Sequence, residues 1–171
     1  MRTQSTIERT PTTLQTNPTG ILTVLSVSPL DADHLSLQTI IGDSTWIVYK
    51  THELVSALVL LQQHDIAVVL CERDLLPGSY IDMLEHISAL PNAPSLIVVS
   101  RLADERLWAE ALNLGAWDVL AKPFDRNELV RSVKSAWRHW HDQGELHTNR
   151  AIQEMAAAGT SNLKLTAASI G

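Results

Sequence analysis

The chain has 171 residues, 45% of them hydrophobic, which suits one domain with a substantial core. Its 13 Lys and Arg against 19 Asp and Glu give a formal net charge of −6 without a basic block, so a nucleic-acid-binding surface is not expected. The single cysteine, Cys71, excludes an internal disulfide. Neither a signal-peptide core nor an apolar run of roughly 18 residues occurs, so we expect a cytoplasmic protein without a membrane span.

The first segment, residues 1–19, is rich in Thr, Pro, Gln and Ser and predicts a disordered tail. From residue 20 onward, short apolar runs alternate with segments of helical periodicity. The runs have the β-branched, apolar composition of strands that are buried on both faces. They cover residues 21–27, 45–49, 66–71, 95–99 and 118–121.

A helical pattern follows each predicted strand. Asp31 and Asp33 open the first helix, because acidic residues favour the positively polarised N-terminus of a helix. Thr51 and Asp125 are the expected N-caps of the second and fifth helices. Gly115 follows the fourth helix, where a left-handed residue is favoured.

Strands that are apolar on both faces require helices on both sides of the sheet. The sequence therefore predicts an α/β fold of the flavodoxin-like, doubly wound type, with five parallel strands in the order 2-1-3-4-5. No GxGxxG follows the first strand and no Walker lysine occurs, which disfavours the nucleotide-binding versions of this architecture.

In an open parallel sheet, ligands bind beyond the carboxyl ends of the strands. A carboxylate, a hydroxyl and a lysine at neighbouring strand ends could surround one anionic group. The candidate residues at these ends are Ser26, Val27, Ser28, Glu72, Asp74, Ser100, Lys122 and Pro123.

The run from Gly115 to Phe124 resembles the fifth-strand signature of response-regulator receiver domains, with a Gly-Ala, an acidic residue and a Lys-Pro-Phe. Ser100 and Lys122 suit the receiver hydroxyl and lysine, and residues 72–78 resemble the loop after the phospho-acceptor strand. The resemblance covers residues 20–143 and leaves residues 144–171 as a tail, a helical extension followed by disorder.

Two departures from the family pattern change what the resemblance implies. Receivers place two acidic residues after the first strand to hold Mg²⁺, whereas Ser26, Val27 and Ser28 occupy this place. Glu72 takes the place of the acceptor aspartate, with Asp74 as the alternative. The resemblance therefore implies a degenerate pseudo-receiver with no catalytic residue, metal ligand or cofactor, in which Glu72 pairs with Lys122 at a solvent-facing strand end.

We therefore expect a stand-alone signalling module that contacts a histidine kinase, another regulator or an output protein, with no direct contact to nucleic acid. A homodimer stays open, because Trp137 and Trp140 suit either helix packing or a dimer face. One alternative is a conventional phospho-acceptor that uses Asp74 or Glu72 with Mg²⁺. Another is a small flavodoxin-like enzyme or cofactor binder. The Glu72–Lys122 pair could also be purely structural.

Overall fold

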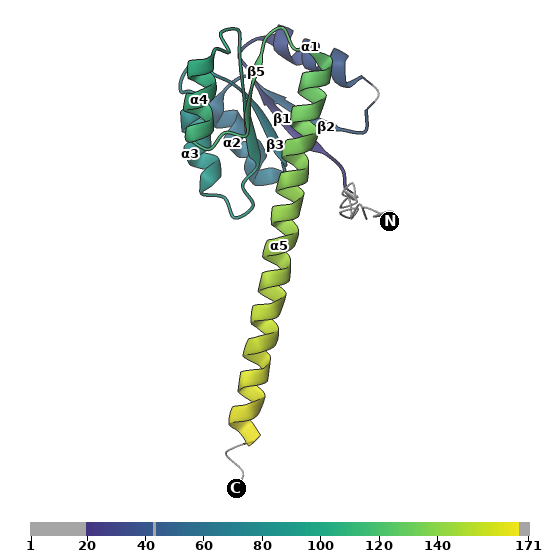
Figure 1. The fold of residues 1–171 in the computed structure, drawn as a ribbon, viewed down its shortest axis with the longest axis vertical. Helices are drawn as coiled ribbons and strands as arrows, with labels where there is room; N and C mark the ends of the chain where they lie inside the picture. The colour runs from purple at the N-terminus through teal and green to yellow at the C-terminus, as the bar shows by residue number, and fades with distance from the viewer. Residues whose placement is uncertain (1–19, 43, 168–171) are drawn as a thin grey trace, which may run out of the picture.

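The computed structural model describes residues 20–42 and 44–167, with side chains described as far as residue 158. The predicted tail at residues 1–19 and the last four residues lie outside this part of the chain. Strands and helices alternate along it (Figure 1). The elements are β1 Thr23–Val27, α1 Asp31–Ile41, β2 Ile47–Thr51, α2 Leu54–Gln63, β3 Val68–Glu72, α3 Tyr80–Ser88, β4 Ser95–Ser100, α4 Glu105–Asn113, β5 Asp118–Ala121 and α5 Arg126–Ala167.

The strands form one parallel sheet in the order β2-β1-β3-β4-β5, which confirms the predicted flavodoxin-like topology. β1, β2 and β3 each begin two residues later than the apolar runs predict, because ladder pairing and not hydrophobicity decides where a strand starts. The ladder carries β3 on to Glu72, which pairs with Val99, and β4 on to Ser100, which pairs with Ala121. These extensions bring two candidate residues into the sheet edge itself.

Helices cover both faces of the sheet, as the two-sided apolar strands require. α1 and α5 pack on one face, and α2, α3 and α4 pack on the other. The first face buries Leu37, Ile41, Leu129, Val133 and Ala136 from its helices, and the second buries Ala57, Met83, Ile87, Leu107 and Ala111 from its helices.

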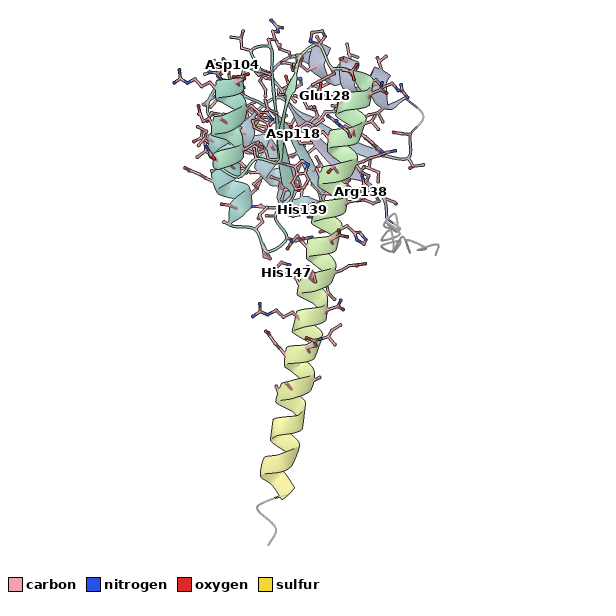
Figure 2. The ribbon with its side chains drawn as sticks, in the orientation of Figure 1. Asp104, Asp118, Glu128, Arg138, His139 and His147 are labelled. Carbon is pink, nitrogen blue, oxygen red and sulfur yellow. The ribbon has the colours of Figure 1, made fainter. Side chains whose placement is uncertain are left out.

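Most of the predicted helix ends carry the expected groups. The Asp125 carboxylate accepts a hydrogen bond from Glu128 N (2.8 Å) and caps α5 as predicted. Asp104, labelled in Figure 2, caps the start of α4 in the same way, although this cap was not predicted from the sequence. Gly115 has the left-handed φ of 102° expected after α4. The cap predicted at Thr51 is wrong: Thr51 is the last residue of β2 and pairs with Val27 of β1, and Glu53 occupies the N-cap position of α2.

The last helix, α5, is much longer than the sheet that it covers. Its first part packs on the core, and Trp137 and Trp140 are half-buried there. The helix has 42 residues in all, and its second part continues beyond the domain, past His147 (Figures 1 and 2). The boundary between residues 143 and 144 therefore falls inside one continuous helix. Among the described residues, no helix combines the length and apolar character needed to cross a bilayer.

Candidate functional site

Lys122 stands at the centre of a buried ionic cluster at the carboxyl edge of the sheet. It follows β5, and its Nζ donates to Glu72 Oε2 at the end of β3 and to Asp33 Oδ2 of α1, the latter at 2.7 Å. The three side chains are only 7%, 10% and 13% exposed, for Lys122, Glu72 and Asp33 respectively. Two carboxylates thus share one ammonium at a nearly dry site. We call these three residues the ion triad.

The burial of Glu72 corrects the expectation that this residue lies at a solvent-facing strand end. Glu72 is the last residue of β3, which runs between β1 and β4 in the middle of the sheet. Only 8% of the residue is exposed. A glutamate in such a position requires a charged partner, because burial of an unpaired carboxylate is very costly. Lys122 supplies that partner.

Asp33 is the site residue that sequence reasoning misses, since the local pattern presents it only as a helix opener. It lies 89 positions before Lys122 in the chain, so no local pattern connects the two residues. One signal is nevertheless present. α1 begins directly beyond the carboxyl end of β1, so polar residues in its first turn lie at the same edge of the sheet as Glu72 and Lys122.

The end of β1 holds α1 in place through its serines. Ser28 Oγ donates to Asp33 Oδ2, the same oxygen that Lys122 contacts. Ser26 Oγ lies 3.0 Å from His34 Nδ1, and His34 Nε2 lies 3.2 Å from the carbonyl oxygen of Ser28. Val27, between the serines, is fully buried. The positions where the family pattern has an acidic pair therefore make polar contacts with the first turn of α1.

His34 is a second residue that the sequence does not single out. Burial is the largest cause that lowers its pKa below the usual 6.5, and the neighbouring His52 lowers it further. The neutral ring then donates from Nε2 to the Ser28 carbonyl and accepts at Nδ1 from the Ser26 hydroxyl. Neutral His34 thus matches its two partners without a net charge.

The remaining candidate residues lie at or near this edge without joining the triad. The Ser100 hydroxyl accepts a hydrogen bond from Leu102 N (3.1 Å), while the Ser100 carbonyl accepts one from Lys122 N (2.9 Å). The Lys122–Pro123 peptide bond is cis. Asp74 points into solvent, and its side chain is 75% exposed. Its Oδ1 lies 3.6 Å from Arg73 Nε. The structure therefore places Asp33, and not Asp74, beside Lys122 and Glu72.

This set of groups does not fit Mg²⁺, the ion that receiver domains hold at this edge. Mg²⁺ needs free oxygen ligands in nearly octahedral geometry. Both carboxylates of the triad already accept hydrogen bonds from Lys122, and Ser28 is bound to Asp33. Within the described part of the chain, no group of three or more His, Cys, Asp or Glu residues is placed to hold a metal ion.

Comparison with known proteins assigns the fold to a family. The sequence pattern of the response regulator receiver domain matches residues 32–134, more than half of the chain. The chain therefore belongs to the response regulator receiver domain family, which confirms the resemblance read from its fifth-strand signature.

Two of the curated relatives are larger transcriptional regulators. The chain is 25% identical over 120 residues to the transcriptional regulatory protein ZraR of Salmonella typhimurium, covering 70% of this chain and 26% of ZraR. It is 31% identical over 87 residues to the transcriptional regulatory protein FixJ of Azorhizobium caulinodans, covering 50% of this chain and 41% of FixJ. The chain thus matches between about a quarter and two fifths of these relatives.

Two solved receiver structures match this chain over nearly their whole length. The signal receiver domain of an HD domain-containing protein from Pseudomonas fluorescens Pf-5 superposes with a TM-score of 0.68 at 23% identity, covering 76% of this chain and 96% of that one. A CheY-like receiver domain protein from Methanospirillum hungatei superposes with a TM-score of 0.64 at 18% identity, covering 72% of this chain and 99% of that one. At these identities the likeness establishes the fold alone.

Proposed function

We propose that this receiver domain is a signalling module that works by protein–protein contact and without conventional aspartate phosphorylation. The observation that carries the proposal is the ion triad. The Glu72 carboxylate is bound to Lys122, and we assign Glu72 to the place of the acceptor aspartate, so that this contact stands in for one to a phosphoryl group. A carboxylate fixed in this way imitates part of the charge of a phosphorylated site, with one negative charge fewer than an acyl phosphate.

The loss of metal ligands supports the same proposal. Phosphoryl transfer needs a divalent cation to neutralise the developing charge on the transferred group. Two hydroxyls and a valine stand where the family has its acidic pair, and the Lys122 ammonium already contacts both carboxylates of the triad. We expect Mg²⁺ to bind too weakly to detect at about 10 mM, which corresponds to less than roughly 3 kcal/mol of binding free energy.

The proposed partners are a histidine kinase, a second regulator or an output protein. Docking would use the last two strand–helix units, where Leu102 and Trp108 are exposed beside and on α4. Trp is among the residues enriched at the energetic centres of protein interfaces. Lys122 N donates to the Ser100 carbonyl and Leu102 N donates to the Ser100 hydroxyl, so the end of β4 links the triad to the segment before α4.

Incubation with acetyl phosphate and Mg²⁺, followed by intact mass measurement, tests the proposal. We expect no mass gain of one phosphoryl group on the wild-type chain. The Asp74→Ala and Glu72→Gln variants should give the same negative result. A phosphoryl adduct on wild type that disappears in either variant would replace the proposal with a conventional phosphorelay role and would identify the acceptor.

A further inference from the structure

We propose that Asp33 is a positioning residue that locks the Lys122 ammonium in place, so that α1 closes the site with a carboxylate of its own. The inference rests on the proposed function, because a site whose ammonium is held by a carboxylate of the same chain suits a receiver that signals without phosphorylation. In this view the tethered ammonium is the resident cation of the site, and Asp33 keeps it there.

The first support is the geometry of the triad. Asp33 Oδ2 lies 2.7 Å from Lys122 Nζ, and both side chains are almost fully buried. Asp31, two positions earlier in the same turn, shows the contrast. Its side chain is 86% exposed and pairs with His52 at the surface. A charge-assisted contact in a dry site is much stronger than a surface ion pair, so Asp33 and not Asp31 can hold Lys122.

The second support is the way in which Asp33 is itself held. The Ser28 hydroxyl donates to the oxygen that faces Lys122, and the Ser28 carbonyl is bound in turn by His34. These hydrogen bonds orient the Asp33 carboxylate toward Lys122 at the sheet edge. Such support from neighbouring groups is what makes a positioning residue effective.

The third support is the space that the triad leaves. A surface pocket of about 290 Å³ lies beside it, lined by Ala32, Asp33, Ser36, Arg101, Lys122 and Phe124 among others. An anion that enters this pocket finds Lys122 already paired with two carboxylates, whose negative charges outweigh its single positive charge. Asp33 lines this pocket and Glu72 does not, so Asp33 is the carboxylate that the anion would displace to reach the ammonium, which ties the occupancy of the site to the position of α1.

Amine labelling of the full chain tests the lock. An acetylating N-hydroxysuccinimide ester reacts with free lysine amines, and peptide mass spectrometry gives the rate at each lysine. In wild type, Lys122 should react at least about tenfold more slowly than the exposed Lys50 and Lys134. In Asp33→Asn its rate should rise by about tenfold, which corresponds to about 1.4 kcal/mol. The ¹⁵N resonance of Lys122 Nζ should shift in the same variant.

Asp31→Asn is the matched control, because it removes one charge from the same helical turn without touching the triad. The Asp31→Asn variant should leave the acetylation rate of Lys122 unchanged. An unchanged Lys122 rate in a folded Asp33→Asn protein would overturn the inference. Should that variant fail to fold, Ser28→Ala decides: a severalfold rise supports the lock, and no rise overturns it. A phosphoryl adduct on wild type would instead reject the proposed function while leaving the labelling result to stand.

Discussion

Lys122 is the shared counterion of two buried carboxylates, so its removal should cost more than the loss of either carboxylate. Lys122→Met leaves Asp33 and Glu72 facing each other without a counterion, and we expect a loss of about 3–5 kcal/mol in the free energy of unfolding. Glu72→Gln keeps the Asp33 contact and should cost about 1–3 kcal/mol. Urea denaturation at pH 7 measures both, and an inverted order would contradict the account of the triad.

His34 should make stability depend on pH. Its folded-state pKa is lowered below 6.5, so the unfolded chain takes up a proton at this residue where the folded chain does not. The free energy of unfolding should therefore be highest above pH 6.5 and should fall as pH falls through the range just below it. His52 and Lys50 also lower this pKa, whereas Asp31 raises it, so these groups tune the same transition.

The measurement is a series of urea denaturations between pH 7.5 and 5, in steps of about half a unit around the reference pKa. His34→Gln keeps a donor for the Ser28 carbonyl but cannot titrate, so its slope should be flatter. His86→Gln, at an exposed position on α3, is the control and should keep the wild-type slope. Identical slopes in wild type and His34→Gln would show that His34 does not carry the effect.

At the scale of the elements, two glycines have opposite roles. Gly115 ends α4 with φ of 102°, and a Cβ at this position would meet open space, so Gly115→Ala should lose about 1–2 kcal/mol through the backbone alone. Gly144 lies inside α5, and a Cβ there would meet Asn92 Oδ1 at an ordinary 3.9 Å. Gly144→Ala should therefore gain about 0.5–1 kcal/mol. Thermal or urea unfolding of both variants checks this pair of opposite signs.

At the scale of the whole molecule, the projecting part of α5 should contribute little to the stability of the domain. Residues 150–158 are exposed along their whole described length. A chain that ends after Asn149 should unfold within about 0.5 kcal/mol of wild type, although its helical circular dichroism signal decreases. A chain that ends before Trp137 is the contrast, because it also loses the packing of Trp137 and Trp140 on the core. A large loss in the first truncation would show that the extension supports the domain.

Local patterns in the sequence are enough to establish the architecture and the family. Apolar runs and helical periods alternate five times, and this pattern already requires a parallel sheet covered on both faces. The run from Gly115 to Phe124 identifies the receiver family, and Ser26, Val27 and Ser28 are the basis for the prediction that the acidic pair is missing. The sequence alone can predict these features because each is defined within one short segment of the chain.

The composition of the site, in contrast, depends on contacts between distant parts of the chain. Asp33 reaches Lys122 across 89 positions and Glu72 reaches it across 50, and no periodicity encodes contacts of that range. Asp31 and Asp33 look equivalent in sequence, yet the turn that follows β1 aims one at solvent and the other at the triad. Burial of a charge depends on which distant group can neutralise it, and only the folded sheet edge brings that group within reach.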